Sequence, residues 1–145
     1  MAAQPVNGGR PLRVLVTGGG GGIGLAVAKA FAANGARVHV CDVDELRLGA
    51  VVAAGGSLSG GVADVADHAS VYKLFDTVRE TLGGLDVLVN NAAISGPFGP
   101  VEENDPALWA KTISINLVGQ FNCAREAVPL LRGAGGGNVE SMRRH

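Results

Sequence analysis

The sequence predicts an α/β fold, a doubly wound parallel sheet of about four strands whose elements follow the order βαβαβαβα. Short runs rich in Val, Leu and Ile alternate along the chain with longer segments of helical periodicity. Glycines cluster at the junctions between these segments, where turns are needed. Because 47% of the 145 residues are apolar, the chain also has the material for one buried core.

Two strand–helix units are expected in the first part of the chain. The β-branched run at 12–17 predicts a buried strand, and five consecutive glycines follow it at 18–22. A helix is expected over 23–34 and an alternating strand over 36–42. A second helix is expected over 44–54, capped by its first residue. The expected buried face of the first helix consists of Ile23, Val27, Ala30 and Phe31.

The rest of the chain continues this alternation. A weaker strand at 58–65 precedes a helix at 67–82, whose apolar residues fall on one face. The run LDVLVN at 85–90 predicts the fourth strand. An Asp-Pro pair predicts the start of a long helix over 106–131, with a bend near 116–119.

Composition and charge exclude several classes of function. A net charge of −1 gives no field that would attract nucleic acid or an anionic membrane. No apolar stretch approaches the ~20 residues of a membrane span, and the start lacks a secretory signal. The two cysteines form no paired motif, so they are expected to be buried and reduced, which favours a cytoplasmic protein. The three histidines have no ligand spacing, so no metal site is predicted.

A glycine-rich loop between a buried strand and a helix is typical of a phosphate-binding site. Glycine lets the backbone turn tightly and approach a pyrophosphate, and the helix N-terminus offers free N–H groups. Asp42 ends the second strand, roughly 20 residues after the loop, where a carboxylate can accept hydrogen bonds from an adenosine ribose. A P-loop is the competing interpretation, but Ile23, Gly24 and Leu25 stand where it needs Lys and Ser or Thr.

The carboxylate of Asp42 also bears on the choice between the two nicotinamide dinucleotides. It would repel the 2′-phosphate of NADP, and no Arg or Lys lies in the loop or directly after Asp42 to hold that phosphate. NAD is therefore the expected cofactor, preferred over NADP. A flexible glycine turn and a strand-end acid that meets only water are the alternatives that involve no ligand.

With these features the chain resembles the short-chain dehydrogenase/reductase family. The matching residues are Thr17-Gly18 with Gly22-Ile23-Gly24, Asp42, Asp64-Val65, Asn90-Asn91-Ala92-Ala93, and Asn116 within SINLVGQF. The resemblance implies a Rossmann-like fold, a dinucleotide cofactor, and interconversion of an alcohol and a carbonyl. The implied cofactor-binding residues are Gly18, Gly21, Gly22, Ile23, Gly24, Asp42, Asp64, Val65, Asn90 and Asn91. The implied catalytic residue is Asn116.

Each of the later residues has an alternative role without a cofactor. Asp64 could accept from the adenine amino group while the Val65 N–H donates to the ring, or it could cap the following helix. Asn90 and Asn91 could hold the loops together next to a bound ribose, or they could have only a structural role in loop hydrogen bonding. By resemblance Asn116 would bend its helix and hold a water of a proton relay; otherwise it is a surface or interface residue.

The acid–base pair of the family is absent from this sequence. In the family a tyrosine exchanges the substrate proton, a lysine four residues later lowers its pKa, and a serine polarises the carbonyl. The one tyrosine here is Tyr72, and Asp76 stands four residues after it. Ser141 falls near the family's serine position, without the apolar strand that would position it. We therefore expect negligible turnover.

The expected organisation has three parts. Residues 1–11 are a disordered leader, 12–139 an incomplete dinucleotide-binding domain, and 140–145 an irregular tail that suggests a truncation or frame change. Without later strands, the strand at 85–90 would form an apolar sheet edge, which favours aggregation or pairing with another chain.

Three classes of function remain. The leading prediction is an NAD(H)-dependent oxidoreductase of the short-chain type that acts on a small carbonyl or alcohol and is present as its cofactor-binding portion. A catalytically inactive dinucleotide-binding or interaction module is the second. A methyltransferase is the third, and the asparagine pair at 90–91 disfavours it. The substrate is not readable from the sequence. By the family's habit, a homo-oligomer is the expected assembly.

Overall fold

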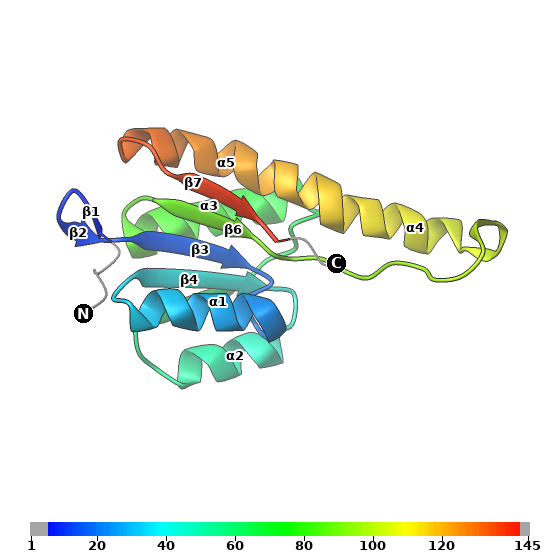
Figure 1. Ribbon diagram of the computed structural model, residues 1–145, viewed down its shortest axis with the longest axis horizontal. Helices are drawn as coiled ribbons and strands as arrows, with labels where there is room; N and C mark the ends of the chain where they lie inside the picture. Colours follow the sequence, from blue (N-terminus) through cyan, green and yellow to red (C-terminus); the bar gives the residue numbers. More distant parts are fainter. Residues whose placement is uncertain (1–5, 143–145) are drawn as a thin grey trace.

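The structure, a computed structural model that describes residues 6–142, is an α/β domain built on one five-stranded parallel sheet (Figure 1). The order of the strands is β5-β4-β3-β6-β7. Their bounds are β3 (Arg13–Thr17), β4 (Arg37–Asp42), β5 (Leu58–Val62), β6 (Val87–Asn90) and β7 (Asn138–Ser141). The order reverses at β3, because the chain first adds strands on one side of it and then crosses to the other. The predicted doubly wound, Rossmann-like fold is confirmed.

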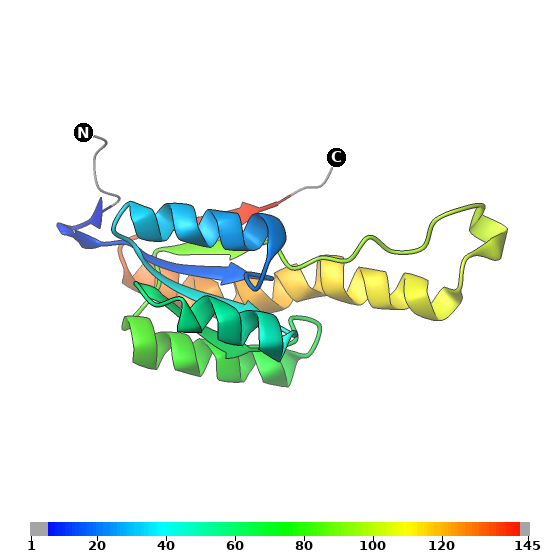
Figure 2. The same ribbon diagram turned by 90° about the horizontal axis from the view of Figure 1, so that it is seen from below.

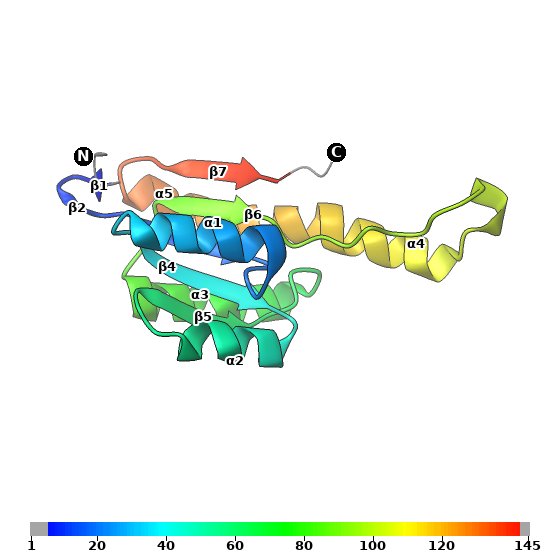
Figure 3. The ribbon, with the colours of Figure 1, turned by 60° about the horizontal axis from the view of Figure 1, so that its bottom comes forward.

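Helices cover both faces of this sheet (Figures 2 and 3). Their bounds are α1 (Gly22–Ala33), α2 (Glu45–Ala53), α3 (His68–Leu82), α4 (Pro106–Ile113) and α5 (Gly119–Gly133). One apolar layer lies between the sheet and the α1–α2 side, and a second lies between the sheet and the α3–α5 side. Between residues 6 and 142, no helix is long and apolar enough to cross a membrane.

The side chains of β3 show why its sequence is apolar at every central position. Val14 and Val16 belong to the layer under α1 and α2, whereas Leu15 belongs to the layer under α3 and α5. A strand covered on both faces loses the polar alternation of a half-exposed strand. On α1 the expected face is confirmed in part, because Val27 and Phe31 pack against the core beside the buried Ala28. Ile23, which is 50% exposed, and Ala30 lie outside the core.

The C-terminal part departs from the prediction of four strands and an irregular tail. β7 pairs in parallel with β6, with Val87 opposite Asn138 and Asn90 opposite Ser141. Residues 140 and 141 are therefore strand, and β6 is not a sheet edge. The polar sequence NVES forms this strand because an edge strand needs backbone pairing on one side and leaves its side chains exposed. Residues 143–145 of the predicted tail lie outside the described residues.

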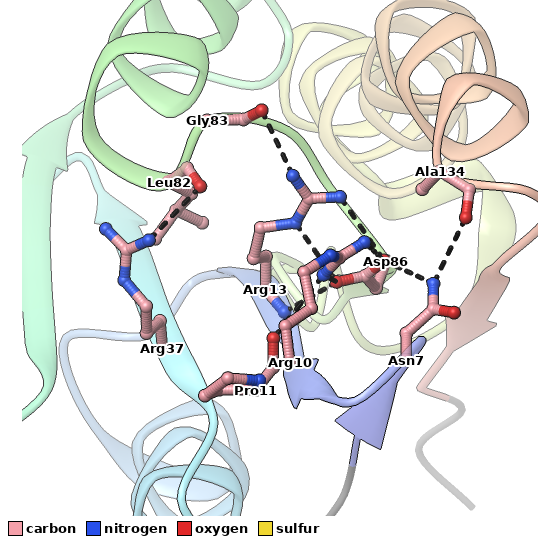
Figure 4. Close-up of polar contacts among 9 residues, drawn as sticks. All are labelled: Asn7, Arg10, Pro11, Arg13, Arg37, Leu82, Gly83, Asp86 and Ala134. Carbon is pink, nitrogen blue, oxygen red and sulfur yellow. Dashed lines mark hydrogen bonds and ion pairs between the residues drawn. The ribbon is translucent and has the colours of Figure 1, made fainter.

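The predicted disordered leader is also partly ordered. Residues 6–11 form an antiparallel hairpin of β1 (Val6–Asn7) and β2 (Arg10–Pro11). The hairpin is held by side chains that bind Asp86, at the start of β6 (Figure 4). Residues 1–5 of the leader lie outside the described residues.

The long helix after the fourth predicted strand changes its hydrogen-bonding pattern at the place where the sequence predicted a bend. A π-helical turn, η2 (Ser114–Val118), separates α4 from α5 and contains Asn116. α4 then projects beyond the sheet together with the segment that connects it to β6 (Figures 1 and 2). Apolar side chains on this projecting arm are exposed, namely Phe98, Val101, Leu108, Trp109 and Ile113. Leu117 of η2 and Phe121 of α5 are exposed as well.

A buried aspartate ties four segments together at the N-terminal edge of the sheet (Figure 4). The Asp86 side chain is 2% exposed and accepts from Arg10 Nη1 at 2.6 Å, Arg13 Nε at 3.1 Å and Asn7 Nδ2 at 2.8 Å. It also accepts from the Arg13 backbone N–H at 2.9 Å. Burial by itself would raise the pKa of Asp86, but these donors outweigh it and hold the pKa well below its usual range. Asn7 further donates to the Ala134 carbonyl at the end of α5.

A second buried polar side chain, His39 on β4, should make the stability of the fold sensitive to acid. His39 is 1% exposed, its Nδ1 lies 2.8 Å from Ser59 Oγ, and its Nε2 has no hydrogen-bond partner. Burial therefore lowers the pKa of His39 from 6.5 to about 4. Because the unfolded chain binds the proton first, the unfolding free energy should fall by up to about 3 kcal/mol as pH drops from 6.5 through 4.

Urea unfolding at a series of pH values measures this loss. His39→Leu should flatten the pH dependence between pH 6.5 and 4.5, since it removes the group that takes up the proton. An unchanged slope in that variant would contradict the assignment.

Candidate functional site

The glycine loop connects the end of β3 to the first turn of α1. The Gly19 N–H donates to the Cys41 carbonyl at 3.0 Å, and the Gly20 N–H donates to Asp42 Oδ2 at 2.9 Å. Both bonds tie the loop to the end of the neighbouring strand β4. The loop is therefore held in place by backbone contacts, and its remaining N–H groups lie at the N-terminus of α1, where an anion is stabilised.

Two positions, Gly18 and Gly24, need glycine because other parts of the backbone lie too close for a Cβ atom. Gly18 has φ +63°, and a Cβ there would lie 2.9 Å from Ala92 Cα. A Cβ on Gly24 would overlap the Gly18 carbonyl and the Asn91 side-chain amide. The first turn of α1 thus packs directly on the loop and on the segment after β6.

Thr17 and Asn91 join the ends of β3 and β6. The Thr17 hydroxyl accepts from the backbone N–H groups of Asn91 and Ala92, both at 3.0 Å. The Asn91 amide in turn donates to the carbonyls of Thr17 and Gly18, both at 3.1 Å. The hydrogen bonds of the Asn91 side chain therefore join the glycine loop to the segment after β6.

A cleft of about 320 Å³ opens at this edge of the sheet. It lies at the carboxyl ends of β3, β4 and β6, where the strand order reverses and where open α/β sheets bind ligands. Its lining residues are Gly18, Gly21, Gly22, Ile23, Cys41, Asp42, Val43, Arg47, Ala63, Asp64, Val65, Asn91, Ala92, Ala93, Ile94 and Ile115. Of the predicted site residues, Gly24, Asn90 and Asn116 are outside this lining.

Asp42 and Arg47 both border the glycine loop at Gly20. The two carboxylate oxygens of Asp42 accept from the N–H groups of Gly20 and Asp44, at 2.9 and 3.0 Å. Arg47 pairs with Asp44, the N-cap of α2, with Nε 3.2 Å from Oδ2. Arg47 was missed from the sequence, because it stands one helical turn beyond the strand end where a basic residue was sought.

The segment after β5 forms the next wall of the cleft. Asp64 is exposed, and its Oδ1 accepts from the Ala66 N–H at 2.9 Å, while Asp67 caps α3. The Val65 carbonyl accepts from Asn122 Nδ2 of α5 at 3.0 Å. A Cβ on Gly119 would lie 2.6 Å from Val65 Cγ2, so α5 packs tightly behind this wall.

Asn116 lines a second cavity of about 470 Å³ that adjoins the first. The Ile94 N–H donates to Asn116 Oδ1 at 2.9 Å, and Asn116 Nδ2 donates back to the Ile94 carbonyl at 2.8 Å. Gln120 also lines this cavity, and its Oε1 accepts from Ser141 Oγ at 3.0 Å. Ile23 and the segment 91–94 border both cavities, so the two share a wall.

Neither cysteine in the core is suited to nucleophilic chemistry. Cys41 and Cys123 are both fully buried. Burial raises the pKa of the Cys41 thiol above its usual range and the pKa of Cys123 to about 12. Over residues 6–142, no group of three or more His, Cys, Asp or Glu side chains is placed to hold a metal ion.

The residues around the first cleft fit a dinucleotide. Free N–H groups at the start of α1 suit a pyrophosphate, and the space beside Gly22 is open, since a Cβ there would meet no atom within 4 Å. Asp42 offers a carboxylate on one side of the loop, and Asp64 and Val65 offer an acceptor and a backbone N–H on the other. The second cavity then lies beyond the glycine loop, next to Asn116.

Comparison with known proteins identifies relatives along most of the chain. The family model described as short chain dehydrogenase matches residues 13–142. A "Short chain dehydrogenase/reductase dpmpG" of Macrophomina phaseolina is 44% identical over 122 residues, which are 81% of this chain and 70% of that protein. A "Short chain dehydrogenase/reductase dpchG" of Colletotrichum higginsianum is 42% identical over 118 residues, which are 79% of this chain and 44% of that protein.

Solved structures show the same architecture. The crystal structure of levodione reductase superimposes with a TM-score of 0.85 at 36% identity, covering 91% of this chain and 54% of the other. Most of these matches cover about half of the relative, as the 44% and 54% coverages show.

Proposed function

The chain belongs to the short chain dehydrogenase family. On that basis we propose that it is the NAD(H)-binding portion of an oxidoreductase that interconverts an alcohol and a carbonyl. The observation that carries the proposal is the cleft at the strand-order reversal, which brings the glycine loop, Asp42 and Asp64 together. The methyltransferase interpretation loses its support with the family match.

Each wall of the cleft has a role in this proposal. The N–H groups around Gly21 and Gly22 bind the pyrophosphate, and Asp42 accepts from the ribose hydroxyls. Asp64 accepts from the adenine amino group, with the Val65 N–H donating to the ring. The nicotinamide, when bound, supplies or accepts the hydride. NAD is preferred over NADP because the Asp42 carboxylate disfavours a second negative charge beside it.

The second cavity is the proposed place for the substrate. Asn116 acts there as a positioning residue, since its side-chain oxygen and nitrogen are both engaged by the Ile94 backbone. It holds the wall shared by the two cavities and terminates α4 in a π-helical turn. The amide keeps one further N–H and one further oxygen lone pair, and with these the side chain would hold a water of a proton relay.

A catalytically inactive dinucleotide-binding module is the second candidate. The one tyrosine, Tyr72, lies on α3 and is 53% exposed, outside both cavities. The proton-transfer pair of the family therefore has no counterpart in these residues.

Two further expectations accompany the proposal. A homo-oligomer is supported by exposed apolar side chains, among them Trp109 of α4 at 56% and Phe121 of α5 at 63%. A cytoplasmic location is supported by two buried cysteines that form no disulfide.

Calorimetric titration of the chain with NAD⁺ tests the proposed cofactor. Saturable binding is expected, and Asp42→Asn should weaken it by about tenfold, because a charge-assisted bond to the ribose becomes a neutral one. Asp67→Asn is the matched control, since Asp67 also accepts a backbone N–H but does not line the cleft. No heat with the unaltered chain would refute the proposal.

The same samples test whether the chain catalyses the reaction by itself. NADH oxidation in the presence of a ketone would show that it carries the full activity. Binding without turnover is the expected result, because Asp76 stands four residues after the one tyrosine, Tyr72, where the family has a lysine.

A further inference from the structure

The peptide group between Val65 and Ala66 is the middle of a short hydrogen-bond chain in the wall of the first cleft. Its carbonyl accepts from Asn122 Nδ2 of α5 at 3.0 Å. Its N–H donates to Asp64 Oδ1 at 2.9 Å. One peptide therefore connects Asn122, which does not line the cleft, to the Asp64 carboxylate, which does.

The donor at the far end of this chain is a buried side chain. Asn122 is 5% exposed, and it stands 57 positions after Val65 in the sequence, so only the packing of α5 brings the two together. A Cβ on Gly119, one turn earlier on α5, would lie 2.6 Å from Val65 Cγ2, so the helix and the wall are in direct contact. Without the Asn122 amide, the Val65 carbonyl would be buried without a donor, and its peptide would have to turn to find one.

Two groups next to this peptide are left for a ligand. Between residues 6 and 142, no group donates to Asp64 Oδ2, and none accepts the Val65 N–H. Val65 is 5% exposed, and both residues line the cleft. A free carboxylate oxygen beside a free N–H is complementary to the amino group and the neighbouring ring nitrogen of adenine.

We propose that Asn122 is a positioning residue of the adenine subsite. By holding the peptide between Val65 and Ala66, it fixes the direction of the Val65 N–H and the place of the Asp64 carboxylate. The inference rests on the proposed function, since it needs the adenine to lie against this wall. Asn122 acts through the wall and does not touch the dinucleotide itself.

Titrations with NAD⁺ and with nicotinamide hypoxanthine dinucleotide test this role. The hypoxanthine analogue has an oxygen in place of the adenine amino group and a proton on the neighbouring ring nitrogen, so it can neither donate to Asp64 nor accept from Val65. The unaltered chain should bind the analogue about tenfold more weakly than NAD⁺. Asn122→Leu should weaken NAD⁺ binding by about fivefold and leave binding of the analogue within about twofold, because only adenine uses the two positioned groups.

Two further variants accompany Asn122→Leu. Asn122→Ser keeps a shorter hydroxyl donor and should retain more of the preference for adenine than the leucine variant does. Asn34→Leu is the matched control, because the Asn34 side chain also donates to a backbone carbonyl, that of Ala30 at 2.8 Å, but it lies at the end of α1 and does not line the cleft. This control should change neither affinity.

The outcomes distinguish this inference from the proposed function. If the unaltered chain binds neither dinucleotide, the proposed function fails. If it binds NAD⁺ and the analogue equally, or if Asn122→Leu weakens both by the same factor, the role of Asn122 is refuted while NAD binding stands. If Asn122→Leu does not fold, Asn122→Ser decides, and an undiminished preference for adenine in that variant refutes the role.

Discussion

Asp86→Ala is expected to lower the free energy of unfolding by about 3 kcal/mol, a large share of the stability of a small domain. The Asp86 carboxylate is 2% exposed, and its loss would leave Arg10, Arg13 and Asn7 without their common acceptor. The hairpin β1–β2 would also lose its anchor to the sheet. Urea unfolding followed by far-UV circular dichroism measures the change.

The chain offers a close control for this variant. Asp76→Ala removes an aspartate that pairs with Arg79 at 2.9 Å but is 53% exposed, so it should cost less than about 0.5 kcal/mol. Asp86→Asn should fall between the two, because the amide oxygen still accepts a bond while the charge is lost. Equal midpoints for Asp86→Ala and Asp76→Ala would show that the buried cluster contributes nothing.

Gly24→Ala is expected to abolish measurable dinucleotide binding at concentrations that saturate the unaltered chain. The new methyl group would overlap the Gly18 carbonyl and the Asn91 amide, so the bonds that hold the loop to β6 must break. The loop would then shift out of the position that aims its N–H groups at the ligand. Overpacking of this kind also costs about 1–3 kcal/mol of stability. Calorimetry with NAD⁺ and thermal unfolding together measure both effects.

Gly49→Ala separates a local effect from a general effect of replacing glycine. Gly49 lies within α2, and a Cβ there would meet no atom within 4 Å. Alanine should stabilise this helix slightly and leave NAD⁺ binding unchanged. Unimpaired binding by Gly24→Ala would mean that the loop tolerates the methyl group and does not form the cradle described above.

Much of the fold was predictable because its signals are local. The strand at Arg13–Thr17, the capped helix at His68–Leu82 and the irregular turn around Asn116 all follow from short apolar runs, cap residues and one polar residue within a helix. The fifth strand, Asn138–Ser141, was not predictable, because its pairing with β6 compensates for a polar sequence. The buried face of Gly22–Ala33 was predicted only in part, because apolar residues surround that helix and their spacing does not determine its orientation.

The site residues also fall into two groups, those that local sequence spacing places together and those that only the tertiary fold brings together. The glycine loop and Asp42 belong to one strand–loop–helix–strand unit, so the spacing places them together. Arg47 was missed because its approach to the loop depends on how α2 leaves β4. The bonding of Asn91 to Thr17 and Gly18 joins residues 73 and 74 positions apart, which only the register of β6 on β3 determines.

The central position of β3 has a consequence for the order of folding. β3 pairs with β4 across one helix, but it pairs with β6 only after the chain has passed through α1, α2 and α3. Closing that long loop has a larger entropic cost than closing the shorter one, so docking of β6 should be the late, slow event. The bonds between Arg13 and Asp86, 73 positions apart, form at this junction and become available only when the second half of the sheet arrives.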